Sequence, residues 1–183
     1  APGSVNAGAV APWLDGTIPS LFAEKNAVAL EAAMQAGTEY ANACQGASSE
    51  ETAAAMMNAL LKGNGLASPR PSSTKIATAL VLKLMEVGST PDSLKTVVTL
   101  LVEKGWTSKK PKVVQVSASL ILDAIHSFGA VHLPLAGISA ALPKILKHTN
   151  KKIRDTGMEI TAELCRSFGS KNPLEPVIEK MQK

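Results

Sequence analysis

The sequence predicts an all-α fold in which helix pairs stack into a solenoid. One observation is a segment that occurs twice, forty positions apart: one helical pattern begins at Lys112 and ends at Gly129, and a matching one begins at Lys152 and ends at Gly169. The other is composition, because 45% of the residues are hydrophobic and only 3% are aromatic, which suits helix packing better than β-structure. A period of about 40 residues is typical of HEAT and armadillo repeats. We therefore expect a HEAT-like helical-repeat solenoid (an α-α superhelix) with four helix pairs and a closing C-terminal helix.

The length of the chain, 183 residues, suits one domain with a substantial core. We expect a flexible leader over residues 1–9 and a single repeat domain over residues 10–183. No apolar run approaches the roughly 20 residues that a membrane span needs, and no secretory signal pattern is present. Cys44 and Cys165 lie far apart without a CxxC motif, which indicates two core thiols in a reducing compartment.

The first two helix pairs are predicted from apolar spacing and turn residues. Apolar residues from Trp13 to Phe22 have helical spacing, and Asn26 caps a helix that runs to about Cys44. The apolar stripe of that helix is expected at Val28, Ala32, Ala36, Glu39 and Tyr40. The second pair has a helix over 50–62 and a break at Gly63-Asn64-Gly65. Its second helix begins near Ser72 or Ser73, after two prolines, and ends at Gly88.

The third and fourth pairs follow the same signals. Pro91 at a first helical position begins a helix that Gly105 ends. Its partner covers residues 111–128. The fourth pair starts near Leu133-Pro134, turns at 148–151 and runs to Phe168. Pro173 opens the closing helix.

Basic charge is concentrated in one stretch of the chain. Residues 104–154 hold nine Lys or Arg and one acid, Asp123, whereas residues 1–103 hold six bases and nine acids. Such an asymmetry favours an acidic partner.

Most of these bases fall in the turns that join the two helices of a pair. Equivalent turns of a solenoid line up along one edge, so we expect the bases to form a ridge in space. Bases at the start of a helix oppose its dipole, which favours a binding role, although solvated surface lysines are the simpler alternative. The bases expected along the ridge are Lys25, Arg70, Lys75, Lys109, Lys110, Lys112, Lys151, Lys152 and Arg154.

Several site classes find no support in the sequence. There is no GxGxxG or GxxxxGK[ST] loop, no nucleophile elbow and no metal-ligand spacing at His126, His132 or His148. We therefore expect no catalytic residue, no metal and no cofactor. Binders of RNA and single strands interleave aromatic residues with bases, and here only Trp106 lies beside the ridge, either exposed or packed between helices. Nucleic acid is therefore the less favoured partner.

The C-terminal half resembles the tumour-overexpressed-gene (TOG) domain of the microtubule polymerase and cytoskeleton-associated protein family. The segments that carry this resemblance are Ser108-Lys109-Lys110-Pro111-Lys112-Val113-Val114, Ala124-Ile125-His126-Ser127-Phe128-Gly129, Leu142-Pro143-Lys144-Ile145-Leu146, Lys152-Ile153-Arg154-Asp155 and Glu163-Leu164-Cys165-Arg166-Ser167-Phe168-Gly169. A weaker similarity reaches back through Pro69-Arg70 to Glu24-Lys25-Asn26-Ala27-Val28, so that the resemblance covers about residues 10–180.

The resemblance implies a non-enzymatic module that binds αβ-tubulin or microtubule ends and promotes microtubule growth as part of a larger protein. Its later turns would supply Lys109, Lys110, Lys112, Asn150, Lys151, Lys152 and Arg154 to α-tubulin. Arg70 and Lys75 would serve the middle turn, and Lys25 and Asn26 would lie towards β-tubulin. It also implies a monomeric domain, without a membrane, at the cytoplasmic microtubule cytoskeleton, including the spindle and the microtubule-organising centre.

One family feature is not visible in the sequence. The first helix pair of the family carries a Trp followed closely by Lys and Arg, whereas Trp13 lacks such neighbours and is interpreted as a core residue. We therefore expect the domain to lack that pair, either because the chain is trimmed or because it is divergent. The alternative functions are a HEAT-repeat scaffold for another acidic protein and, less favoured, a basic helical repeat that binds nucleic acid.

Overall fold

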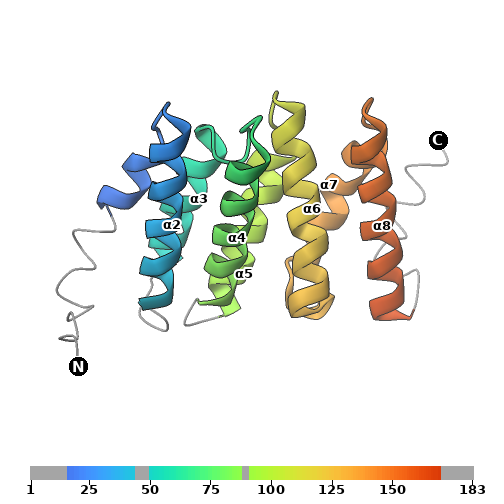
Figure 1. Ribbon diagram of the computed structural model, residues 1–183. Coiled ribbons are helices and arrows are strands. Elements are labelled where there is room, and N and C mark those ends of the chain that lie inside the picture. The colour runs from blue at the N-terminus through green and yellow to red at the C-terminus, as the bar shows by residue number, and fades with distance from the viewer. Residues whose placement is uncertain (1–15, 44–49, 88–90, 170–183) are drawn as a thin grey trace. The chain divides into compact units, whose positions relative to one another are not determined.

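The computed structural model describes residues 16–43, 50–87 and 91–169, and these residues are helical with connecting turns (Figure 1). Residues 16–21 form a short helix. The elements that follow are α2 (Ala27–Ala43), α3 (Glu50–Lys62), α4 (Pro71–Glu86), α5 (Pro91–Leu100), the π-helix η1 (Leu101–Gly105), α6 (Pro111–Phe128), the 3₁₀-helix η2 (Ala130–His132), α7 (Leu135–Leu146) and α8 (Lys151–Phe168). No strand occurs in these ranges, so the all-α prediction is confirmed. The predicted leader, Trp13, Cys44 and the closing helix lie outside them.

The described residues fall into two compact units that divide between Val97 and Val98. In the first unit α2 packs along α4, and α3 also contacts α4. Two hydroxyl groups of α4 join it to α2, because Ser72 Oγ and Ser73 Oγ donate to Glu31 Oε1 at 2.8 and 2.6 Å. Phe22, from the turn before α2, is fully buried in this unit.

In the second unit α6 and α8 lie side by side, with α7 against α8 and η1 against α6. Both long helices end at a glycine with positive φ, Gly129 at 80° and Gly169 at 58°. A residue with a Cβ is strained in this region of φ, so glycine is the natural stop for both helices. The two predicted copies therefore correspond to α6 and α8.

The repeat extends further than the two copies that the sequence revealed. α4, α6 and α8 begin at Pro71, Pro111 and Lys151, which are forty residues apart. Buried positions recur with the same spacing in α2, α4, α6 and α8: Ala33, Ser73, Val113 and Ile153; Gly37, Ala77, Ser117 and Gly157; and Tyr40, Leu80, Leu120 and Ile160. These four helices are the second helices of their pairs, and each of them therefore presents the same face to the core of its unit.

The second of these positions holds a small residue in all four helices, and neighbouring atoms come very close to it in α2 and α8. A Cβ added at Gly157 would lie 2.9 Å from Ile145 Cγ2 and 3.2 Å from Leu146 Cδ2. A Cβ added at Gly37 would lie 3.1 Å from Phe22 Cζ. A larger side chain at this position would therefore push a second helix away from its neighbours.

This crowding gives a stability prediction. We expect Gly157→Val to lower the free energy of unfolding by about 1–3 kcal/mol, because the added methyl groups overpack the contact between α7 and α8. Gly137 in α7 is the matched control, since a Cβ there meets nothing within 4 Å. Gly137→Ala is expected to raise the free energy of unfolding by about 0.5–1 kcal/mol through helix propensity. Urea denaturation measures both changes, and equal effects at the two glycines would contradict the close approach.

Two predicted details were wrong. The apolar stripe of α2 is not Val28, Ala32 and Ala36, because Val28 is 68% exposed and both alanines are exposed, as is Glu39; of the predicted stripe only Tyr40 is buried. The buried face of α2 instead carries Leu30, Ala33, Met34, Gly37, Tyr40 and Ala41. α4 begins at Pro71 and not at Ser72 or Ser73, since proline fits the first helical position, where no amide donor is needed.

Candidate protein-interaction turns

The predicted ridge residues lie in or beside the turns that precede the second helices, which we call the basic turns: residues 22–26 and 63–70 in the first unit, and 106–110 and 147–150 in the second. Within the first unit, the N-termini of α2 and α4 lie at the same edge (Figure 1). Within the second unit, the N-termini of α6 and α8 do the same. Each unit therefore gathers its own predicted bases on one edge.

In the second unit the basic turns present exposed lysines at two helix N-termini. Lys109 and Lys110 precede α6 and Lys112 lies in its first turn, while Lys151 and Lys152 form the first turn of α8; all five are exposed. Neither first turn contains an acidic residue. Because the N-terminal end of a helix carries a partial positive charge, lysines there are electrostatically unfavourable. Helix stability alone does not account for this arrangement.

Two of the predicted contact residues also brace the turn before α8. Asn150 Oδ1 accepts from the backbone N–H of Lys152 at 2.9 Å, which makes Asn150 the N-cap. Arg154 is half-buried, and its Nη1 donates to the carbonyl oxygens of His148 and Thr149, both at 2.8 Å. His148 Nδ1 in turn accepts from the N–H of Asn150 at 3.0 Å. These side chains shape the turn from which Lys151 and Lys152 project.

The cap can be tested separately from binding. We expect Asn150→Ala to lower the free energy of unfolding by about 1 kcal/mol, because an N–H of the first turn loses its acceptor. Asn150→Asp keeps an acceptor oxygen and is expected to retain that stability. Thermal or urea unfolding of the two variants measures the difference, and a stable Asn150→Ala protein would show that the cap is dispensable.

In the first unit the four predicted residues are more varied. Lys25 is exposed, and Asn26 Oδ1 accepts from the N–H groups of Val28 and Ala29 at 2.9 and 3.3 Å, so the predicted cap of α2 is confirmed. Arg70 occupies the N-cap position of α4 without a side-chain cap bond, and Lys75 is exposed one turn later.

An acidic residue of the neighbouring helix lies close to this end of α4. Hydrogen bonds from Ser73 and Ser72, together with the charge of Arg70, hold the pKa of Glu31 below its usual value. Because the carboxylate already accepts both serine hydroxyls, it fixes α2 to the first turn of α4. Sequence reasoning missed Glu31, since its role depends on a contact between residues about forty positions apart.

Bases at the opposite ends of the helices behave differently, because they are paired with acids. Lys83 Nζ lies 3.0 Å from Glu86 Oε2, and Lys95 Nζ lies 3.5 Å from Asp92 Oδ1. Arg166 pairs with Glu163, and this pairing lowers the pKa of the Glu163 carboxyl. Among the described residues, no acid lies in salt-bridge distance of the ridge bases Lys25, Arg70, Lys75, Lys109, Lys110, Lys112, Lys151, Lys152 and Arg154. The basic turns therefore keep their charge available for an external partner.

Trp106 packs inside its unit and is not an exposed anchor. Its side chain is 1% exposed, and its backbone N–H donates to Leu101 O at 2.9 Å, which ends the π-helix η1. Of the two alternatives that the sequence left open, packing between helices is the correct one. Because Trp106 is buried, its ring is not exposed in the basic turns of the second unit for a nucleobase to stack on.

The described residues contain no group of three or more His, Cys, Asp or Glu side chains placed to hold a metal ion. His126 Nε2 lies 3.5 Å from Glu163 Oε1, and Cys165 is a half-buried free thiol. No helix within the described ranges has both the length and the hydropathy to cross a bilayer.

A family comparison covers almost the whole chain. The model of the XMAP215/Dis1/CLASP TOG domain matches residues 7–183. The chain belongs to this TOG-domain family. The basic turns described above are therefore the turns of a TOG domain.

Two curated plant relatives match part of the TOG domain. It is 29% identical over 114 residues to Protein MOR1 of Oryza sativa subsp. japonica and 31% identical over 81 residues to Protein MOR1 of Arabidopsis thaliana, which cover 62% and 44% of this chain. The matches span 5% and 4% of those proteins, so the chain corresponds to a small part of their length.

Solved structures share the TOG fold at low identity. One is a structure of Crescerin, which uses a TOG domain array to regulate microtubules in the primary cilium; its TM-score is 0.78 at 18% identity, covering 94% of this chain and 69% of that chain. A second comes from work on TOG–tubulin binding specificity in microtubule dynamics and mitotic spindle formation, with a TM-score of 0.77 at 14% identity, covering 93% and 70%. A third concerns tubulin recruitment and assembly by microtubule polymerases with TOG arrays, with a TM-score of 0.77 at 21% identity, covering 98% and 36%.

Proposed function

We propose that this TOG domain is a non-enzymatic αβ-tubulin-binding module of a larger microtubule-associated protein that promotes microtubule growth. The observation that carries the proposal is the set of exposed, unpaired bases at the N-termini of second helices, whereas bases at the opposite ends are paired. The tubulin binding and microtubule polymerase activity of the structurally similar TOG proteins support the choice of partner.

The contacts are assigned by unit. In the second unit, five lysines contact acidic side chains of α-tubulin: Lys109, Lys110, Lys112, Lys151 and Lys152. Asn150 and Arg154 shape the turn before α8 and add further contacts to the same surface. Arg70 and Lys75 serve the middle turn, and Lys25 with Asn26 lies towards β-tubulin. The module acts at the microtubule cytoskeleton of the cytoplasm, including the spindle and the microtubule-organising centre.

The mechanism is electrostatic capture by preformed turns. Complementary charge raises the association rate, and added salt slows association because it screens the exposed lysines. The caps and the Arg154 hydrogen bonds keep the turn before α8 in place, so little order has to be gained on binding. No step requires bond making or breaking, so no catalytic residue, metal or cofactor enters the proposal.

Gel filtration with unpolymerised αβ-tubulin at low salt tests the proposal. We expect the chain to co-elute with tubulin and to dissociate as the salt concentration rises. Addition of a single-stranded RNA tests nucleic acid as the alternative partner, since an RNA binder would be displaced from tubulin. Failure to co-elute at low salt would contradict tubulin binding and favour a HEAT-repeat scaffold for another acidic protein.

A further inference from the structure

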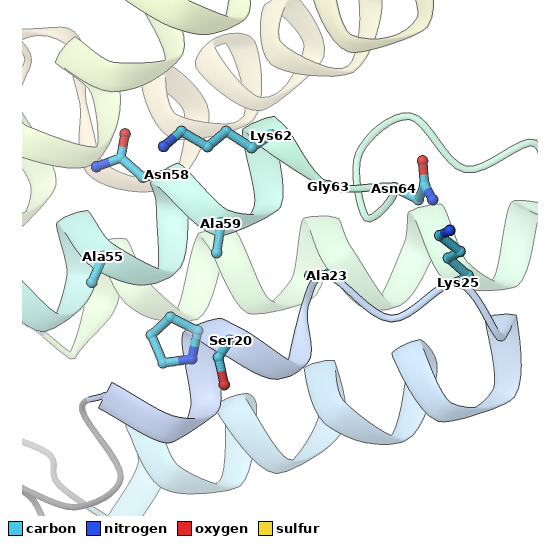
Figure 2. A pocket seen from close by; sticks show the side chains of 10 residues that line it. Ser20, Ala23, Lys25, Ala55, Asn58, Ala59, Lys62, Gly63 and Asn64 are labelled. Atoms are coloured by element: carbon cyan, nitrogen blue, oxygen red, sulfur yellow. The ribbon is translucent and has the colours of Figure 1, made fainter.

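The first unit contains a pocket that borders its basic turns and extends along α3 beyond them. It lies between the segment of residues 19–25 and α3, and its volume is about 580 Å³ (Figure 2). Ser20, Lys25, Ala55, Lys62, Gly63 and Asn64 are among the residues that line it. The volume falls in the roughly 300–1,000 Å³ range of ligand pockets.

The pocket exists because small residues face each other across a close contact. Ala55 and Ala59 point from α3 towards the segment that carries Ser20 (Figure 2). At one end Gly63 closes the gap, since a Cβ added there would lie 2.6 Å from Phe22 O. Phe22 itself is fully buried, which anchors this side of the pocket. The floor of the pocket is therefore made of small side chains, and no bulky side chain fills it.

The lining is basic and polar. Lys25 and Lys62 are both exposed, and no acid lines the pocket. Neither lysine lies in salt-bridge distance of an acid among the described residues. Asn64 and Ser20 add side chains that can hydrogen-bond to a ligand. Unpaired charge at such a site favours an anionic ligand.

The form of the pocket favours an extended peptide over a compact small molecule. Small-molecule sites are lined mainly by apolar and aromatic side chains, and this lining contains no aromatic residue. The absence of an aromatic platform also disfavours a nucleobase. The alanines of the lining leave room for an extended peptide backbone. The surrounding lysines and amides can bind the carboxylate side chains of that peptide.

We propose that this pocket binds an acidic peptide segment of a protein partner, with Lys62 and Lys25 holding its carboxylates. The site is separate from the first-turn lysines of α6 and α8 and does not require that tubulin be the partner. Lys25, Gly63 and Asn64 also belong to the basic turns, so the variants in the test below are at Lys62 and Ala55, which lie in α3 outside those turns.

A labelled oligoglutamate peptide added to the whole chain tests the proposal, with affinity read by fluorescence anisotropy and location read by amide NMR shifts. We expect the amide signals of Gly63 and Asn64 to move on titration. Lys62→Ala removes one charge and is expected to weaken the binding that moves these two signals by about tenfold. Ala55→Leu fills the pocket without a change of charge and is expected to abolish their movement.

The matched control is Lys75→Ala, which removes an exposed charge of the same unit that does not line the pocket. It is expected to leave the shifts of Gly63 and Asn64 unchanged. Equal losses in Lys62→Ala and Lys75→Ala, or shifts confined to Lys109 and Lys110, would overturn the proposal. So would tighter binding of oligouridylate at the same amides, which would assign the pocket to nucleic acid.

Discussion

Charge reversal at Lys109 and Lys112 is expected to weaken αβ-tubulin binding by at least about a hundredfold, because each exposed charge that turns from attractive to repulsive costs about tenfold or more. The fold is expected to survive. Lys112 lies in the first turn of α6, where an acid is favoured by the helix dipole, so Lys112→Glu relieves a local conflict. Binding and stability therefore change in opposite directions in the Lys109→Glu/Lys112→Glu protein.

Co-elution with tubulin and urea unfolding measure the two effects on the same protein. Lys83→Glu/Lys95→Glu is the control of equal charge change, because these lysines are not part of the basic turns and pair with Glu86 and Asp92. We expect that control to keep most of its affinity. If it loses as much affinity as the Lys109→Glu/Lys112→Glu protein, net charge and not the basic turns governs binding.

Truncation of Trp106 is expected to cause the largest loss of stability. Trp106→Ala empties a site that is 1% exposed, which costs about 3–5 kcal/mol of unfolding free energy. Its Nε1–H is buried without a hydrogen-bond partner in the structure, and a buried unpaired donor costs about 1–3 kcal/mol. Trp106→Phe removes this donor and keeps much of the apolar volume, so we expect its loss to be clearly smaller.

Urea denaturation of the two Trp106 variants measures the difference. Tubulin binding of the Trp106→Phe protein is expected to be unchanged, because the side chain does not reach the surface of the turn. A stable Trp106→Ala protein that no longer binds tubulin would instead indicate an exposed anchor.

The sequence predicted the helices best where capping and periodicity agreed. The helix over 111–128 was placed to the residue, because Pro111 and Gly129 mark its ends and its apolar spacing is regular. In α2 the alanines are so frequent that several faces have similar hydropathy, and the wrong face was chosen. The π-helix η1 was also missed, because a π-turn has no spacing signal of its own.

The position of the predicted bases in or beside turns could be predicted, because bases in turns can be read directly from the sequence. What the sequence did not indicate is which of these side chains already have internal hydrogen bonds. Asn150, Arg154 and Asn26 form hydrogen bonds within their own turns, whereas Lys109 and Lys152 are exposed beyond them. The forty-residue spacing could have identified the N-cap positions from the sequence. Arg70, Lys110 and Asn150 lie forty residues apart and occupy equivalent positions before α4, α6 and α8.

The recurrence of the same buried positions in successive helices has a consequence for how the chain unfolds. α2 packs on α4, and α8 packs on α6 and α7, so each helix depends on elements near it in sequence. The free energy of unfolding of such a chain is approximately the sum of the stabilities of its repeats and of the interfaces between adjacent repeats. Local unfolding therefore spreads stepwise from one helix pair to the next. Amide hydrogen exchange would then decline in blocks the length of one repeat, and damage at one pair would leave distant pairs protected.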